Sequence, residues 1–228
     1  MTGLYTFSKS IDTNSTYGTN GEGIVGVFDW TCMPCQRGPS AFDVRQHLAV
    51  EGSVTLPDPW HKGPLSAVLG GWRLLAIAIV QTGEPFTVVT SQPYPKGDYN
   101  RDGYNLDRPN APSYGNSVSV GSRQQWFNGI FLASDFPTPT PGLEGNLGVN
   151  TFRQPGLANV DMNLVKSFRI PWFTKEGANF ELRGQFFNLF NHPNLGTVGN
   201  DLSNASTFGK VTTSLNPRYI QFAARVSF

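Results

Sequence analysis

The last twelve residues, 217–228, read PRYIQFAARVSF and alternate between apolar and polar side chains. One face carries Ile220, Phe222, Ala224, Val226 and Phe228, and the other carries Tyr219, Gln221, Ala223, Arg225 and Ser227. A period of two predicts a β-strand with one apolar and one polar face. The stretch ends on Phe228, and an aromatic side chain there suits a bilayer interface. We therefore expect a fold that gives this strand an apolar environment on one side.

Other stretches repeat this alternation. The predicted strands lie near residues 3–11, 41–56, 72–83, 157–170, 179–191 and 217–228. Lys166 is a misfit on the apolar face of its strand, and the strand near 72–83 is apolar on both faces. Most of these runs exceed the usual strand length of about 5–6 residues, and a tilted strand needs roughly 9–11 residues to cross a bilayer. We predict an all-β, antiparallel up-and-down meander of about six long strands, an incomplete part of a transmembrane outer-membrane β-barrel.

Composition narrows the class of protein. The chain has 228 residues, a net charge of +1 and only 14% charged residues, so its charge predicts no binding to nucleic acid. The mean hydropathy is −0.26, as expected for a β-barrel in which only alternate residues face lipid. Residues 1–10 lack the basic start and apolar centre of a signal peptide, and a predicted strand already occupies 3–11. We therefore expect a carboxy-terminal fragment that begins inside a domain.

The connections between the predicted strands alternate in length. Residues 12–40, 84–156 and 192–216 form long loops, whereas 57–71, with a helical turn near its end, and 171–178 are shorter. Outer-membrane barrels have long extracellular loops and short periplasmic turns. If the last residue lies on the periplasmic side, every long loop is extracellular.

Two sets of side chains fit this placement. Trp60, Trp72 and Trp172 come at the periplasmic ends of strands, where an aromatic girdle belongs, and ordinary core aromatics are the alternative. The polar faces, which would line the lumen, carry charges of both signs that can pair across neighbouring strands. These titratable residues are Asp43, Arg45, His47, Glu51, Arg73, Asp161, Arg169, Glu181, Arg183 and Arg225. Mixed charge does not indicate an ion-selective pore.

Residues 98–103, DYNRDG, match the opening D-x-[DN]-x-[DN]-G of a calcium loop. Hard oxygen ligands at alternate positions, followed by a glycine turn, suit Ca²⁺. The candidate ligands are Asp98, Asn100, Asp102 and Asp107. Pro109 stands where an EF-hand has its bidentate Glu, so the loop is not an EF-hand. We expect a structural Ca²⁺ that rigidifies a long loop, and the alternative is a polar turn whose residues suit tight backbone geometry.

The other candidate motifs predict no enzyme. Cys32 and Cys35 lack the second pair that structural zinc needs, so we expect a disulfide that staples a loop in an oxidising compartment. Residues 21–26, GEGIVG, match G-x-G-x-x-G, but no strand precedes them and no helix has room to follow, which leaves a flexible loop. The three histidines have no carboxylate or cysteine beside them at metal spacing, and no serine lies in a nucleophile elbow.

Short motifs lie along nearly the whole chain: GPSAFDVR at 38–45, GW at 71–72, TGEPFT at 82–87, NTFRQPG at 150–156, NVD at 159–161, FFNLFNHPN at 186–194 and YIQFAARVSF at 219–228. In combination they resemble the carboxy-terminal barrel of TonB-dependent outer-membrane receptors. The closest likeness is to the Oar-like branch, whose members carry a carboxypeptidase-regulatory-like domain. The final motif resembles the terminal strand that the outer-membrane assembly machinery reads.

This resemblance implies a barrel of about 22 strands with a plugged lumen, located in the cell outer membrane, and uptake of a ligand powered through TonB. The implied partners are outer-membrane lipid, the remainder of the barrel and its plug, the TonB system and the assembly machinery. Ligand contacts would come chiefly from the loop 84–156. Six strands cannot close around a plug, so we expect the isolated chain to be inactive in transport and to leave two sheet edges unpaired.

A secreted all-β module that binds a ligand or carbohydrate, with a calcium-stabilised loop, is the alternative. The two hypotheses differ in where the apolar strand faces point. In a soluble sandwich these faces meet an opposing sheet. In a barrel wall they form an exposed patch far larger than the several hundred Å² found on soluble monomers.

Overall fold

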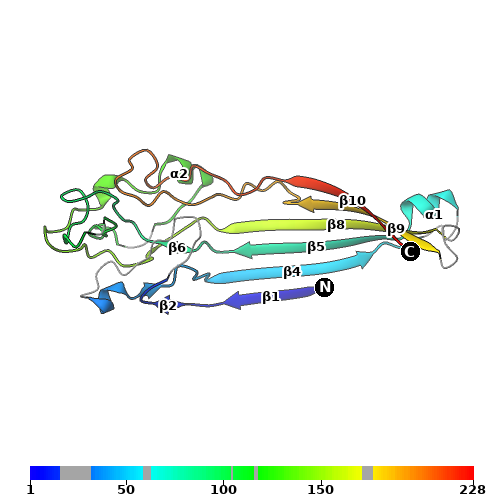
Figure 1. The fold of residues 1–228 in the computed structure, drawn as a ribbon, viewed down its shortest axis with the longest axis horizontal. Helices are drawn as coiled ribbons and strands as arrows, with labels where there is room; N and C mark the ends of the chain where they lie inside the picture. Colours follow the sequence, from blue (N-terminus) through cyan, green and yellow to red (C-terminus); the bar gives the residue numbers. More distant parts are fainter. Residues whose placement is uncertain (16–31, 59–62, 104, 116–117, 171–176) are drawn as a thin grey trace.

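Six antiparallel strands form one sheet in the computed structural model, which describes residues 1–15, 32–58, 63–103, 105–115, 118–170 and 177–228. The strands are β1 (Thr2–Phe7), β4 (Gln46–Thr55), β5 (Trp72–Gln81), β8 (Leu157–Ile170), β9 (Ala178–Phe187) and β10 (Tyr219–Ser227). Their order is β1-β4-β5-β8-β9-β10, so each strand pairs with the next of the six along the chain (Figure 1). The predicted all-β, up-and-down meander is confirmed, and we call this sheet the wall.

The register of the wall keeps apolar and polar side chains on separate faces. Directly paired residues share a face, and the next row along the strands lies on the opposite face. One row across β4, β5, β8, β9 and β10 consists of Val54, Leu74, Leu164, Gly184 and Phe222. The adjacent row consists of Ser53, Leu75, Asn163, Gln185 and Gln221. The alternation of the sequence therefore gives the wall an apolar and a polar face, with β5 contributing apolar residues to both.

Asp43 shortens two of the predicted strands. The predicted strand 41–56 begins only with β4, because the chain before it forms a turn. The buried carboxylate of Asp43 accepts a hydrogen bond from the backbone N–H of Ser10 at 2.7 Å. This contact also draws the neighbouring chain out of the sheet, so the predicted strand 3–11 divides into β1 and the short β2 (Ile11–Asp12).

The other strands end close to their predicted limits. The predicted strands 72–83, 157–170 and 217–228 correspond to β5, β8 and β10. The predicted strand 179–191 is too long, because β9 gives way to a turn in which Asn188 and Asn191 both have φ of 50°. The backbone N–H of Asn188 donates instead to the carboxylate of Asp161 at 2.8 Å. A positive φ is incompatible with an extended strand, which explains the boundary.

One end of the wall carries the helix α1 (Pro64–Leu69), which confirms the helical turn predicted there (Figure 1). Lys166, the misfit on the apolar face, reaches this helix, and its ammonium group donates to the carbonyl oxygens of Gly70 and Ser66. A positive charge is favourable at the carboxy-terminal end of a helix, so the structure satisfies the misplaced charge. In the described part of the chain, no helix is both long and apolar enough to cross a membrane.

Trp72 begins β5 at this end of the wall, and its indole N–H donates to the carbonyl oxygen of Val68 at 2.9 Å. The indole is therefore held against α1, next to the boundary between strand and connection. Trp60 and Trp172, the other members of the predicted aromatic girdle, lie outside the described residues.

The long loops fold together at the opposite end of the wall (Figure 1). We call the described parts of residues 8–15, 32–45, 82–156 and 188–218 the loop cap. It contains β2, η1 (Met33–Gln36), β3 (Gly38–Pro39), β6 (Pro85–Phe86), α2 (Arg123–Asn128), η2 (Ala133–Asp135) and β7 (Phe152–Arg153). β2 pairs with β3, and β6 with β7. The predicted loops 12–40, 84–156 and 192–216 are thus structured where they are described.

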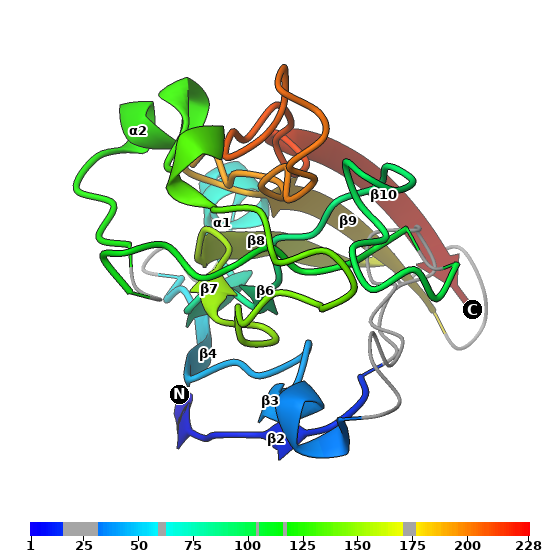
Figure 2. The same cartoon turned by 90° about the vertical axis from the view of Figure 1, so that its left-hand side faces the viewer.

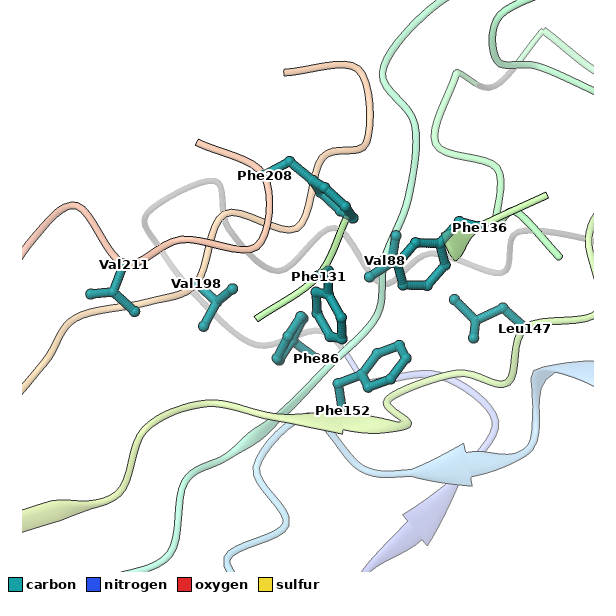
Figure 3. Close-up of a cluster of buried hydrophobic side chains, with 9 residues drawn as sticks. All are labelled: Phe86, Val88, Phe131, Phe136, Leu147, Phe152, Val198, Phe208 and Val211. Atoms are coloured by element: carbon teal, nitrogen blue, oxygen red, sulfur yellow. The ribbon is translucent and has the colours of Figure 1, made fainter. Parts of the chain in front are cut away.

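A hydrophobic core lies inside the loop cap. Its buried side chains are Phe86, Val88, Phe131, Phe136, Leu147, Phe152, Val198, Phe208 and Val211 (Figure 3). Phe131 lies among the aromatic rings, with its ring centroid 4.6 Å from that of Phe152 and 5.4 Å from that of Phe136. The loops therefore bury their apolar side chains against one another, as the interior of a soluble domain does.

Candidate functional site: the wall and the loop cap

The apolar face of the wall is exposed. Phe222 on β10 is 80% exposed, and Ile220 on the same strand, Val54 on β4 and Val80 on β5 are each about half exposed. No second sheet covers this face within the described ranges, because the other two sheets are the short pairs β2–β3 and β6–β7. The alternative of a soluble sandwich is therefore wrong, and the face suits contact with lipid.

The opposite face carries charged and amide side chains. Along β9, Glu181 and Arg183 form an ion pair of 2.5 Å between Oε1 and Nε. Along β8, the amide of Asn159 donates to the carboxylate of Asp161 at 2.8 Å. We predicted ion pairs across neighbouring strands, whereas these contacts join residues two apart in one strand, which lie on the same face. Both signs of charge are present on this face, as in the polar lumen of a barrel.

The wall is open at both edges. Viewed along the strands from the loop cap, the sheet forms an open curve with β10 and the amino-terminal strand β1 on opposite sides (Figure 2). Among the described residues, β1 pairs only with β4, and β10 pairs only with β9. Every residue of β10 is exposed. The backbone groups on the outer edges are therefore available to further strands.

An ionic anchor joins two segments of the loop cap just before β4. The guanidinium of Arg153 forms an ion pair with the carboxylate of Asp43, which also contacts Arg45 at 3.2 Å. Burial alone would raise the pKa of Asp43. The hydrogen bond from the backbone of Ser10 and the contacts with Arg153 outweigh burial and lower this pKa. The anchor therefore depends on an ionised Asp43.

A second buried ion pair lies within the loop cap. The guanidinium of Arg108 binds the carboxylate of Glu144 through two contacts of 2.9 and 3.0 Å, and both side chains are almost fully buried. Arg108 also donates to the carbonyl oxygens of Leu147 at 2.9 Å and Cys35 at 3.2 Å. Cys35 is in turn joined to Cys32 by a disulfide, as predicted. No sequence pattern singled out the ion pair, because its two members are far apart in the chain.

A cleft of about 270 Å³ opens in the loop cap beside α2. Its lining includes Arg123, Trp126 and His192, with Arg123 Nη2 lying 3.3 Å from His192 Nε2. Cationic and aromatic groups therefore face the same space. Such a combination can hold the polar and apolar parts of a small ligand.

Three of the predicted calcium ligands, Asp98, Asn100 and Asp102, lie in one tight turn of the loop cap. Asp98 accepts a hydrogen bond from the backbone N–H of Gly103 at 3.2 Å, and Asn100 accepts one from the N–H of Asp102 at 3.1 Å. The φ angles of Asp98 and Gly103 are 43° and 89°, as expected for a turn rich in Asp, Asn and Gly. The described residues contain no group of three or more His, Cys, Asp or Glu side chains that could hold a metal. Asp98, Asp102 and Asp107 therefore do not form such a group among the described residues, and calcium binding here stays a prediction.

Asp107 lies next to this turn and is fully buried. Its Oδ2 accepts a hydrogen bond from the backbone N–H of Asn100 at 3.2 Å, while its Oδ1 has no hydrogen-bond partner among the described residues. Burial raises the pKa of Asp107 to about 6, and the nearby charges of Glu144 and Asp102 also raise it, against hydrogen bonds from the backbone. Among the described residues, no ion pair to Asp107 is found.

The family model for an outer membrane beta barrel domain matches residues 1–221. The chain belongs to this family. The match includes β1, β4, β5, β8, β9 and the start of β10, together with the loop cap between them. No curated protein and no solved structure matches the chain. The wall and the loop cap are therefore parts of one outer-membrane domain.

Membership of the outer membrane beta barrel family locates the chain in the bacterial outer membrane. The wall is a segment of an outer-membrane barrel, with its apolar face toward lipid and its polar face toward the lumen. β4, β5, β9 and β10 have 10, 10, 10 and 9 residues. These lengths agree with the roughly 9–11 residues that a tilted strand needs to cross the bilayer.

Several other predicted features can now be located. His192 lies at the cleft and contacts Asn194 through Nδ1 at 3.1 Å, and His47 lies on β4. The G-x-G-x-x-G stretch 21–26 and His61 lie outside the described residues. The aromatic core of the loop cap was missed, although the phenylalanines of loop 84–156 were a signal for it.

Proposed function

We propose that the chain supplies barrel wall and extracellular loops to a TonB-dependent outer-membrane receptor that takes up a ligand. The observation that carries this proposal is the combination of an open, bilayer-length wall with a loop cap that has its own core. A simple small barrel needs closed edges, whereas a large receptor barrel has room for further strands and a plug. The resemblance of the short motifs to those of the Oar-like branch favours the same function.

In this proposal the loop cap faces the outside of the cell. Outer-membrane barrels carry long loops on the extracellular side and short turns on the periplasmic side. The described parts of the long connections meet at the loop cap, and α1 lies at the opposite end (Figure 1). A ligand would first meet the loop cap, and the cleft beside α2 is then a candidate for its first contacts.

The proposal assigns the exposed edges of the wall to other parts of the receptor. The edge of β1 would pair with a preceding strand of the barrel, and the edge of β10 with the strand that closes it. The polar face would surround a plug, and TonB would act on the receptor from the periplasm. The assembly machinery would recognise β10 together with Phe228, which follows this strand and is 89% exposed.

Gel mobility before and after boiling tests the membrane part of the proposal. The chain would be produced alone and as the carboxy-terminal part of a full receptor barrel, and both would be folded into detergent. We expect the complete barrel to migrate differently before and after boiling, and the isolated chain to aggregate. A soluble, cooperative monomer formed by the isolated chain without detergent would contradict the proposal.

Binding to TonB tests the receptor part separately. The outer-membrane protein that carries this chain would be extracted in detergent and passed over the immobilised periplasmic domain of TonB. We expect specific retention, which an excess of soluble TonB domain abolishes. A protein that shows a heat-dependent mobility shift but no retention would be an outer-membrane barrel of another function.

A further inference from the structure

Three segments of the loop cap form the cleft beside α2. They are residues 120–126, which include the start of α2, residues 155–156 just before β8, and residues 192–195 after β9. In Figure 2, α2 lies beside the orange segment that follows β9. The volume of about 270 Å³ lies just below the usual range of about 300–1,000 Å³ for ligand pockets. The cleft therefore suits a small ligand or one end of a larger molecule.

Hydrogen bonds hold two of these segments in place. The side-chain oxygen of Gln125 accepts the backbone N–H of Ser122 at 3.0 Å. The buried Asn188 accepts the backbone N–H of His192 through its side-chain oxygen at 2.8 Å. The walls of the cleft are therefore formed before any ligand binds.

The contact with Asn194 determines which nitrogen of His192 carries a proton. Asn194 Oδ1 accepts the backbone N–H of Ala158 at 2.9 Å and lies 3.1 Å from His192 Nδ1. Because an amide oxygen only accepts, Nδ1 is the donor. The other ring nitrogen, Nε2, lies 3.3 Å from Arg123 Nη2, which always donates, so this contact requires a neutral ring with Nε2 as acceptor. His192 therefore positions the guanidinium of Arg123 without adding a second positive charge.

The guanidinium of Arg123 is available to an anion. Among the described residues that line the cleft, Arg123 is the one charged side chain and none carries a carboxylate. No ion pair to Arg123 is found in the described part of the chain. A guanidinium has five N–H groups, and one of them is directed at His192, so others remain for a ligand. Their planar arrangement matches the two oxygens of a carboxylate.

Apolar side chains form much of the remaining surface of the cleft. The lining includes Val120, Pro155, Pro193, Leu195 and Trp126. Trp126 and Leu195 are partly buried and pack against the hydrophobic core of the loop cap. This part of the cleft therefore has firm support and suits the carbon skeleton of a ligand.

We propose that the cleft binds a small organic acid with one negative charge, its carboxylate on Arg123 and its flat, apolar skeleton against Trp126 and the neighbouring apolar side chains. One guanidinium balances one negative charge. A phosphate monoester carries about −1.5 to −2 charges at pH 7, so part of its charge would remain uncompensated here. The inference rests on the proposed function, because it names the class of ligand that the receptor would meet at its loop cap.

The test uses the full outer-membrane protein that carries this chain, extracted in detergent. Benzoate is the probe, and its binding would be titrated by saturation-transfer NMR. We expect saturable binding with a Kd of about 10⁻³ M, because so small a ligand buries little surface. Benzamide has the same shape without the charge and should bind about tenfold more weakly, as should acetate, which lacks the ring. Phenyl phosphate should bind no more tightly than benzoate.

Matched variants locate the site. Arg123→Gln removes the guanidinium and should weaken benzoate binding about tenfold or more, with little change for benzamide. Arg101→Gln is the control and should leave the affinity for benzoate unchanged. Arg101 is also an exposed arginine of the loop cap, but it lies outside the cleft, with its guanidinium carbon 4.0 Å from the centre of the Tyr94 ring. A heat-dependent mobility shift verifies that each variant is folded.

The proposal is wrong if the folded wild-type protein shows no saturable binding of benzoate, or binds benzamide equally well. Equal benzoate affinity in the wild type and in Arg123→Gln would place the acid elsewhere, and an equal loss in Arg101→Gln would indicate a general attraction to positive charge. Tighter binding of phenyl phosphate than of benzoate would overturn the assignment to a singly charged acid.

Retention on the TonB domain separates this inference from the receptor function. A protein that binds benzoate through Arg123 but is not retained would contradict the receptor function and support the assignment of the cleft. A retained protein that does not bind benzoate would contradict the assignment of the cleft alone.

Discussion

The wall and the loop cap use apolar side chains in opposite ways. In the loop cap, nine buried side chains form a core, and Phe131, Phe136 and Phe152 contact one another. In the wall, side chains such as Phe222 point outward and stay exposed. The difference shows that one chain is built for two surroundings: water around the loop cap, and lipid on one face of the wall.

The two regions also differ in how their polar groups are satisfied. The wall uses strand pairing for its backbone, and its polar face carries ion pairs such as Glu181–Arg183 that remain partly exposed. The loop cap has little regular structure and relies on ion pairs whose carboxylates are buried, Asp43 with Arg153 and Glu144 with Arg108. Substitutions of the same residue type should therefore change the free energy of unfolding by different amounts in the two regions.

The largest expected effect is the loss of the central ring of the loop cap. Phe131→Ala should lower the free energy of opening the loop cap by about 3–5 kcal/mol, because it leaves a cavity in a close-packed core. Amide hydrogen exchange should accelerate in the loop cap and stay unchanged in the wall. The control is Phe190→Ala, whose side chain is 73% exposed. If amide exchange in Phe131→Ala accelerated equally in the loop cap and in the wall, the two regions would not be separate folding units.

Asp43→Asn comes next, because Asp43 lies where the two regions meet. Removing the charge leaves Arg153 without its carboxylate partner and should lower the free energy of unfolding by about 3 kcal/mol. The lowered pKa of Asp43 means that its stabilisation is complete above about pH 4, the value for an unfolded chain, and is lost as the pH falls through the folded-state pKa. Urea unfolding at several pH values should show this acid-dependent loss in the wild type but a reduced loss in Asp43→Asn.

A charge introduced on one face of β10 or on the other tests which face contacts lipid and which lines the lumen. Phe222→Arg puts a cation on the apolar face and should lower the free energy of unfolding in lipid vesicles by about 2–3 kcal/mol. Gln221→Arg, one residue away on the polar face, should have little effect. If the two substitutions had the same effect on refolding, the assignment of the faces would be wrong.

The smallest expected effect is at Lys166. Lys166→Met removes the donor to the Gly70 carbonyl at the end of α1 and should destabilise that helix by about 0.5–1 kcal/mol. Proteolysis near α1 should become faster, while the loop cap keeps its protection. Lys210→Met is the control, because the ammonium of Lys210 donates to the Ser206 carbonyl within the loop cap at 3.2 Å. Faster cleavage at α1 in the control would contradict a local role for Lys166.

The wall could be predicted from the sequence because its signal is local. Side-chain alternation in 157–170 and 217–228 defines both the strands and their faces, and the register then aligns those faces. The predicted strand near 41–56 was too long because Asp43 fits the alternation of that stretch. In the structure its carboxylate contacts Ser10 and Arg153, and Asp43 lies outside the sheet. That contact joins residues distant in sequence, which no local pattern can reveal.

The loop cap could be predicted much less well. Its length and its Gly, Pro and Asn content indicated loops, but its core depends on contacts between residues such as Phe86 and Phe208 that are far apart in the chain. The acidic turn was recognisable from its spacing, whereas the burial of Asp107 and its unpaired oxygen were not. Sequence patterns therefore identified the turn, but not the burial of the carboxylate beside it.

The most direct test of the central claim is the accessibility of a nitroxide label at each position of β10 in lipid vesicles. Residues 219–227 would be changed to Cys one at a time in the complete outer-membrane protein, and collisions with oxygen and with a water-soluble paramagnetic reagent would be measured. We predict that oxygen reaches positions 220, 222, 224 and 226 most readily, whereas the water-soluble reagent reaches the alternate positions. Equal access of the water-soluble reagent to both sets would contradict a wall with one face in lipid.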